Sequence, residues 1–272
     1  MAMPPACETT VAPAAPASAT TVAPAPPART ASPWLRLHLL LFPAVCIGCR
    51  CWLDPLAPAH AGHPHVCADC YGALPWRGHA DSVPGAAVSR DAEAVERVWA
   101  PWHFEEPVRG WIHQLKYEQR DALAVALGRL AAGAEFGAAP LAGVNLIAPV
   151  PLHRRRLRER GFNQAALLAH QWRRELVRRG HRAPALVPGL LARTRYTVPQ
   201  VQLSALERLA NVTGAFARGR MRGKGGGKPL DGLRVLLVDD VMTTGATLAT
   251  CAAVLHDAGA AAVDALVLAR TG

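Results

Sequence analysis

One stretch near the C-terminus, residues 234–250 (RVLLVDDVMTTGATLAT), constrains the fold more than any other part of the chain. Val235–Val238 form a short apolar run with β-branched residues, as expected of a buried central strand in a parallel sheet. Asp239 and Asp240 follow at the carboxyl end of this strand, where open α/β sheets bind ligands. We expect a helix to begin near Thr247, so that backbone N–H groups and hydroxyls converge at its positive N-terminus. The pattern predicts an α/β fold with a ribose-phosphate site.

The same residues admit a simpler interpretation, a strand-to-helix turn in which Asp and Thr side chains only cap the helix. One Thr would suffice for a cap, and two adjacent acids repel each other, so a ligand site is favoured. All thirteen positions from Val235 to Thr247 resemble the fingerprint with which type I phosphoribosyltransferases bind phosphoribosyl diphosphate, PRPP. The resemblance implies that the paired acids Asp239 and Asp240 hydrogen-bond the ribose hydroxyls. It also implies that the 5-phosphate is held by the loop Thr243, Thr244, Gly245, Ala246 and Thr247.

Four cysteines, Cys46, Cys49, Cys67 and Cys70, follow the spacing C-x2-C-x17-C-x2-C, which lies in the range of four-thiolate zinc ribbons. Each CxxC turn can direct two sulfurs to one tetrahedral ion, and the metal would supply folding energy to a segment with little core. A disulfide pair is the alternative, and the lack of a secretion signal disfavours it. Cys51 lies outside the two CxxC pairs and is not assigned as a ligand. We therefore predict a closed, structural zinc site with the four cysteines as ligands.

Composition bounds the organisation of the 272-residue chain, of which 51% is hydrophobic. This is enough for one main domain and a small appendage. Residues 1–33 are rich in Ala, Pro and Thr and are expected to form a disordered tail. We place the zinc ribbon at residues 42–78 and the main domain at 95–272. Because no apolar run reaches the ~18 residues of a membrane span, we expect a cytoplasmic protein.

Positive charge is concentrated in the middle of the chain. Between Val150 and Leu230 there are 18 Lys and Arg against 3 Glu, a net charge of +15, whereas the remainder carries −5. Such a segment suits a ligand with several phosphates, such as PRPP, and it equally suits nucleic acid. An ordinary solvated basic face is the third interpretation.

Taken in order, the motifs make the chain resemble the ComF family of competence-associated, phosphoribosyltransferase-like proteins, from about Phe42 to Arg270. The matching pieces are FPAVCIGC, CADC, HQLKYEQRDALA, APVPLHRRRLRERGFNQAALLA, RTRYTVPQVQLSALERLANVTGAF and the PRPP fingerprint. The resemblance implies a type I phosphoribosyltransferase-like doubly wound parallel sheet with a small N-terminal zinc ribbon.

The motifs between the ribbon and the fingerprint are interpreted as the other walls of a PRPP pocket. Residues 144–150 are an apolar run that predicts a second core strand. By family analogy the turn of Pro151, Leu152, His153 and Arg154 is the pyrophosphate-binding loop, and Arg155 could add charge to it. The last arginines of this basic run, Arg156, Arg158 and Arg160, are interpreted as solvated. A helix of roughly 162–179 should follow, and Asn163 and Gln164 at its start could either cap it or face the ligand.

The segment 193–216 lies where type I enzymes carry a mobile hood over the active site. If it is that hood, Arg193 would clamp the pyrophosphate and help to exclude water. The alternative is an amphipathic surface helix with Leu203, Leu206 and Leu209 inward. Farther upstream, Lys116 lies among apolar residues of a predicted helix, and a lone Lys there usually faces solvent. The family resemblance also makes Lys116 a site candidate.

Two functions from different classes fit these features. The first is a Mg-dependent phosphoribosyltransferase, in which a base or amine displaces pyrophosphate from PRPP and catalysis rests on positioning and charge. The second is a competence-associated factor that keeps the fold without turnover and binds imported single-stranded DNA or competence proteins.

Overall fold

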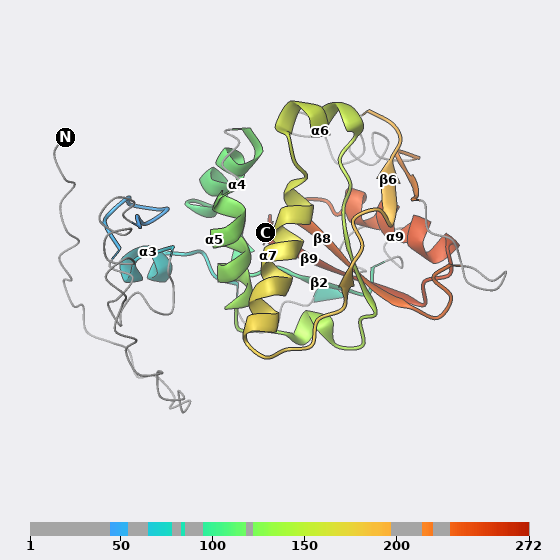
Figure 1. Ribbon diagram of the computed structural model, residues 1–272, viewed down its shortest axis with the longest axis horizontal. Coiled ribbons are helices and arrows are strands. Elements are labelled where there is room, and N and C mark those ends of the chain that lie inside the picture. The colour runs from blue at the N-terminus through green and yellow to red at the C-terminus, as the bar shows by residue number, and fades with distance from the viewer. Residues whose placement is uncertain are drawn as a thin grey trace, which may run out of the picture. The chain divides into compact units, whose positions relative to one another are not determined.

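The computed structural model describes residues 44–53, 65–77, 83–84, 95–117, 122–196, 214–219 and 229–271. The chain divides into two compact units, Met1–Ala73 and Leu74–Gly272, which are treated separately below (Figure 1). The tail predicted for residues 1–33 lies outside the described residues. None of the helices in the described part of the chain is long and apolar enough to cross a membrane.

The second unit contains most of the regular structure. Its helices are α4 (Val108–Tyr117), α5 (Ala122–Ala132), the short 3-10 helix η3 (Ala139–Leu141), α6 (Arg154–Arg160), α7 (Gln164–Arg178) and α9 (Ala246–Asp257). Its strands are β1 (Val83–Pro84), β2 (Arg97–Trp99), β3 (Trp102–His103), β4 (Leu146–Pro149), β5 (Ala185–Leu186), β6 (Leu191–Arg193), β7 (Phe216–Arg218), β8 (Arg234–Met242) and β9 (Ala262–Arg270).

The central sheet is mostly parallel and, in the part of the chain that the structure describes, has seven strands. Their order is β1-β2-β9-β8-β4-β5, with β3 also pairing with β9, and among these described strands only the β1–β2 pair is antiparallel. From β4 the chain passes through α6 and α7 to β5 on one side, and from β8 it passes through α9 to β9 on the other. Because parallel connections are right-handed, a reversal of direction between β4 and β8 places helices on both faces. The prediction of an α/β fold is confirmed, and the topology is compatible with a doubly wound sheet.

The two long strands are buried because helices cover the sheet. β9 is buried from Ala262 to Ala269, and β8 is buried from Val235 to Val238. α7 packs against α5 and β8. α9 packs against β8 and β9 and lies away from the α5–α7 pair (Figure 1). Strands covered on both faces have near-continuous apolar runs, which is the pattern in the sequence.

Two differences from the sequence expectations concern strand ends. β8 does not stop at Val238: Asp239, Val241 and Met242 continue to pair with β9, so the two acids lie within the strand and not after it. The expected core strand 144–150 spans only Leu146–Pro149. The helix after the fingerprint begins at Ala246, one residue before the predicted Thr247.

The region predicted to be a hood is described only at its two ends. β6 and β7 pair antiparallel, with Arg193 opposite Phe216, and they form a separate two-stranded sheet. Residues 197–213 lie outside the described residues. The choice between a hood and an amphipathic helix with Leu203, Leu206 and Leu209 inward therefore stays a prediction.

A buried carboxylate on α7 contacts arginines at the end of its own helix and on α5. Glu175 is 3% exposed, and its oxygens accept hydrogen bonds from Arg178 (2.6 and 2.9 Å) and from Nε of Arg179 (3.1 Å). Nε of Arg129 on the neighbouring α5 lies 3.8 Å from the same carboxylate. The hydrogen bonds from Arg178, followed by those from Arg179, outweigh burial and lower the pKa of Glu175 from 4.5 to about 2.

This carboxylate predicts a pH-dependent stability. A depressed folded-state pKa stabilises the fold above pH 4.5, and the contribution is lost as the pH falls toward 2. We expect Glu175→Gln to lower the free energy of unfolding at pH 7 by at most about 3 kcal/mol, and the difference from wild type to shrink toward pH 2. Urea unfolding at several pH values measures this. Glu159→Gln, in an exposed pair with Arg155, should change stability by less than about 1 kcal/mol at every pH, and an equal effect of both variants would contradict the prediction.

Candidate functional site

A cavity of about 670 Å³ opens in the second unit at the carboxyl ends of β4 and β8. These strands are neighbours, with Pro149 opposite Val238, and the chain leaves them in opposite directions along the sheet. Ligands of open α/β sheets bind at such a point, because the two connections diverge and leave a crevice between them. The volume lies within the range of small-molecule sites.

The paired acids both line this cavity. Asp240 is 8% exposed, and its backbone N–H donates to Oδ1 of Asp239 at 2.8 Å. Oδ1 of Asp240 lies 2.8 Å from Nζ of Lys116. Burial, and next the charge of Asp240, raise the pKa of Asp239 to about 7. Removal from water disfavours the charged form, and a second carboxylate close by disfavours it further.

The threonine loop forms the next part of the wall. Thr243, Thr244 and Thr247 line the cavity, whereas Gly245 and Ala246 are not among the lining residues. Gly245 is the N-cap of α9 and adopts the left-handed conformation with φ 76°, which glycine reaches at no steric cost. Because glycine has no side chain to cap the helix, N-capping does not explain the threonines that precede it.

The loop after β4 contributes differently from the sequence expectation. Pro151 and Leu152 line the cavity, but His153 and Arg154 do not. His153 instead caps α6, because its Nδ1 accepts from the backbone N–H of Arg155 at 3.2 Å.

Arg156 and Arg160 of α6 line the cavity, although they were expected to be solvated. They are four residues apart, which places them on one face of a helix. The guanidinium carbon of Arg156 lies 5.7 Å from the ring centre of Tyr196, and that of Arg160 lies 5.3 Å from the ring centre of Tyr117. The i, i+4 spacing directly after the pocket loop is the signal that could have identified them.

Asn163 and Gln164, at the start of α7, combine the two roles left open by the sequence. Oδ1 of Asn163 accepts from the N–H of Ala165 at 3.0 Å, and its Nδ2 donates to the carbonyl of Val150 at 3.0 Å. Gln164 is 1% exposed, and its Oε1 accepts from Arg160 at 3.1 Å. Both residues line the cavity, so the helix cap also forms part of the wall.

Arg193 reaches the cavity from β6, with its guanidinium carbon 5.1 Å from the ring centre of Phe216. Burial lowers the pKa of Arg193, and the charge of Asp239 opposes this shift. The lining residues comprise four cations, Lys116, Arg156, Arg160 and Arg193, against the two acids. Among the described residues the wall therefore has a net charge of +2 when both acids are ionised, and it favours an anionic ligand.

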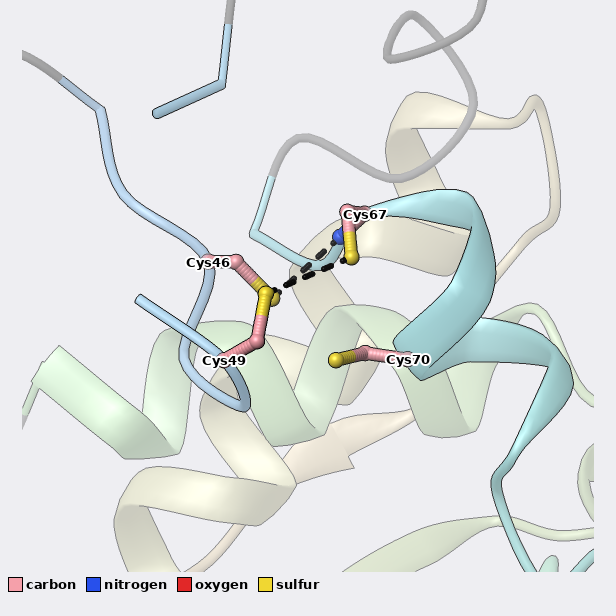
Figure 2. Close-up of side chains that lie close together, drawn as sticks. All are labelled: Cys46, Cys49, Cys67 and Cys70. Carbon is pink, nitrogen blue, oxygen red and sulfur yellow. Dashed lines mark hydrogen bonds between the residues drawn. The ribbon is translucent and has the colours of Figure 1, made fainter. Parts of the chain in front are cut away.

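The first unit contains the second candidate site, where the four predicted cysteines come together (Figure 2). Their Sγ atoms all lie within 4.8 Å of one another, and those of Cys49 and Cys67 are 3.6 Å apart. Four zinc–sulfur bonds of about 2.3 Å in a tetrahedron separate the sulfurs by about 3.8 Å, so the cluster fits such an ion. The cysteines are free thiols, and together they could bind a metal such as zinc.

Short local structures position the sulfurs. Val45 and Trp52 form an antiparallel bridge that closes the first CxxC turn, and the N–H of Cys46 donates to the carbonyl of Cys51 at 2.9 Å. The second pair lies at the start of α3 (Ala68–Gly72), with Cys67 as its N-cap. Sγ of Cys46 accepts from the N–H groups of Gly48 and Cys67 at 3.4 Å each, which fixes the position of this sulfur. Although burial acts to raise it, hydrogen bonds with Cys51 and other cysteines lower the pKa of Cys49 to about 7.

Comparison with known proteins shows several relatives, although no family model matches the chain. The DNA utilization protein YhgH of Salmonella typhi is 33% identical over 247 residues, which cover 86% of this chain and 100% of the relative. YhgH of Escherichia coli K12 is 32% identical over 251 residues, with the same coverage. Competence protein F of Haemophilus influenzae is 33% identical over 174 residues, 62% of this chain and 70% of the relative.

Proposed function

The chain belongs to the ComF family, which includes proteins named for DNA utilization and for competence, and from this premise we propose that it acts in the handling of DNA taken up by the cell. We propose further that the cavity of the second unit binds PRPP or a related phosphoribosyl ligand on a type I phosphoribosyltransferase-like fold. The observation that carries this second part is the meeting of two acids, the three threonines of the loop 243–247 and four cations in one cavity at the ends of adjacent parallel strands.

Each wall of the cavity has a role in this proposal. Asp239 and Asp240 accept hydrogen bonds from the ribose hydroxyls. Thr243, Thr244 and Thr247, with the backbone of Gly245 and Ala246, hold the 5-phosphate at the N-terminus of the twelve-residue helix α9. The pyrophosphate lies between the loop 151–154, Arg193 and the α6 arginines, where positive charge offsets its phosphates. Mg ions that accompany PRPP would supply further positive charge to offset its phosphates.

The proposed reaction is transfer of the phosphoribosyl group to a base or amine. A nitrogen of the acceptor attacks C1 of the ribose, the bond from C1 to the pyrophosphate oxygen breaks, and pyrophosphate leaves with the electron pair while the acceptor loses a proton. No side chain of the cavity wall is placed as a nucleophile in this scheme, so the rate enhancement rests on positioning and on charge around the leaving group.

Isothermal titration of the full chain with PRPP and Mg tests the ligand directly. We expect saturable binding of one PRPP per chain. A wild-type protein with no measurable heat of PRPP binding would remove the phosphoribosyl part of the proposal. Turnover is tested separately by following pyrophosphate release in a screen of candidate acceptors.

A second candidate function is binding of single-stranded DNA without turnover, and the surface around Tyr196, next to α6, favours it. Tyr196 is 39% exposed, with the guanidinium carbons of Arg155 at 4.9 Å and Arg156 at 5.7 Å from its ring centre. His153 meets the same ring edge-on at 5.4 Å. Proteins that bind single strands combine cationic grooves with aromatic rings on which bases stack. The names of the relatives support this candidate, and a cytoplasmic location is part of it.

This candidate predicts salt-dependent binding that depends on the tyrosine ring. We expect the affinity for a labelled single-stranded oligonucleotide, measured by fluorescence anisotropy, to fall steeply between 50 and 200 mM salt. Tyr196→Ala should weaken binding by roughly tenfold or more, because stacking of one base contributes about 1–3 kcal/mol. Tyr196→Phe is the matched control and should bind as wild type does. Affinity that is flat with salt, or equal for Tyr196→Ala and wild type, would contradict the assignment.

For the first unit we propose a closed structural zinc site with Cys46, Cys49, Cys67 and Cys70 as its ligands. The mutual distances of their sulfurs support four-coordinate binding, which leaves no position open for a water. Bound zinc would stabilise a segment that has little apolar core of its own.

A further inference from the structure

Lys116 makes an unusual contact for a surface lysine. It is the penultimate residue of α4, whose buried face consists of Val108, Trp111, Ile112 and Leu115. Its side chain is only 23% exposed and reaches into the cavity, where Nζ lies 2.8 Å from Oδ1 of Asp240. Of the two interpretations of this lysine, solvent-facing or site candidate, the contact favours the site candidate. Long lysine side chains normally keep their charge in water, so an inward ammonium requires a partner that stabilises it.

The hydrogen bonds around the two acids leave one oxygen of each for a ligand. Oδ1 of Asp240 is paired with Lys116, and Oδ1 of Asp239 accepts from the backbone N–H of Asp240. Among the described residues, no donor contacts the second oxygen of either carboxylate. Each acid is thus held at one oxygen by the protein, and the other oxygen is available for a ribose hydroxyl.

The titratable groups around Asp239 come from four elements. Asp240 on β8 opposes its ionisation, and Lys116 on α4 and Arg193 on β6 favour it. Cys251 on α9 adds no charge near neutral pH, because burial raises the pKa of its thiol. Burial and Asp240 together raise the pKa of Asp239 to about 7 even with the two cations in place. Loss of either cation would favour the protonated, uncharged acid at physiological pH.

We propose that Lys116 is a positioning residue that fixes the Asp240 carboxylate and keeps Asp239 ionised, so that both acids accept hydrogen bonds from a ribose. The inference rests on the phosphoribosyl ligand proposed above. It assigns α4, which contributes no part of the fingerprint, a role in the ribose site. An ammonium at this place also favours the ligand phosphates, but that attraction does not depend on how the acids titrate.

The test compares the pH dependence of PRPP binding in the wild type, Lys116→Met and Lys116→Arg. Wild-type binding should strengthen as the pH rises through about 7, the pKa of Asp239. In Lys116→Met the midpoint should move upward by roughly one pH unit, which lowers the affinity by about tenfold at any pH below both midpoints. Lys116→Arg keeps the charge and should keep the midpoint. The ligand phosphates titrate identically in every variant, so differences between midpoints report on the protein.

A ligand-free measurement separates this inference from the proposed function. Carbon-detected NMR titration of the aspartate carboxyls should show the Asp239 midpoint moving upward in Lys116→Met. The Asp239 midpoint should stay in place in Arg109→Met, which removes from the same helix an exposed charge that is paired with Glu106. Unchanged midpoints in Lys116→Met would overturn the inference, even if its affinity for PRPP fell equally at every pH. A shifted Asp239 midpoint in a protein that does not bind PRPP would support the electrostatic role and reject the ligand.

Discussion

Loss of any one cluster cysteine is expected to unfold the segment around it. Structural zinc contributes on the order of 10–16 kcal/mol of apparent binding free energy to small zinc-dependent folds at pH 7, and most of this disappears when a thiolate is lost. We expect one zinc per chain under reducing conditions, measured by atomic absorption, and none in Cys46→Ser or Cys67→Ser. In both variants, amide hydrogen exchange should become fast in residues 44–53 and 65–73. PRPP binding should survive, because the cavity consists of residues of the second unit.

Cys51→Ser is the matched control for this prediction. Cys51 is buried at 8% exposure and hydrogen-bonds Cys49, but it is not a member of the four-sulfur cluster. The proposed ligand set therefore requires that Cys51→Ser retain its zinc. A wild-type protein without stoichiometric zinc, or a Cys51→Ser variant that loses the metal as completely as Cys46→Ser does, would show that the ligand assignment is wrong.

Asp239→Asn and Asp240→Asn are expected to weaken PRPP binding by at least about tenfold each, because each change removes a charge-assisted hydrogen bond of about 1.5–3 kcal/mol. Calorimetry at pH 8, where Asp239 is ionised in the wild type, measures this effect. The direction of the change in PRPP affinity distinguishes lost hydrogen bonds from a change in charge. Electrostatics alone would strengthen the binding of an anion when a carboxylate is removed from the wall, so weaker binding points to lost hydrogen bonds with the ribose.

Inorganic pyrophosphate separates the two effects because it has no ribose. We expect the same Asn variants to bind pyrophosphate as tightly as the wild type or more tightly, while they bind PRPP more weakly. Asp257→Asn, near the exposed C-terminal end of α9, is the matched control and should leave both affinities unchanged. PRPP affinities of Asp239→Asn and Asp240→Asn equal to that of the wild type would rule out the proposed role of the acids.

The features that the sequence predicted best are those encoded by neighbouring residues. The apolar run before Asp239 and the Thr-Thr-Gly turn after it specify a strand, a tight turn and a helix from local preferences alone. Cysteine spacing is similarly local, because two CxxC turns suffice to direct four sulfurs to one point. The α/β class, the ComF resemblance and the gathering of these four cysteines were all predicted in this way and confirmed.

Long-range packing decided the remaining details of the site. β8 continues through the acids because Asp239, Val241 and Met242 pair with residues of β9. Where a strand ends depends on the length of the strand next to it in the sheet. The rotation of α6 about its axis decides which of its side chains line the cavity, namely Arg156 and Arg160 and not His153 and Arg154. Nothing within the arginine run itself specifies that rotation.

By itself the sequence determined which local elements form and which residues could carry a phosphoribosyl or zinc site. Only the tertiary structure placed Lys116 against Asp240 and Arg193 near Asp239, across α4, β6 and β8. The physical reason is that charges interact through space according to distance and burial, whereas sequence patterns report mainly on the periodicity and preferences of neighbouring residues.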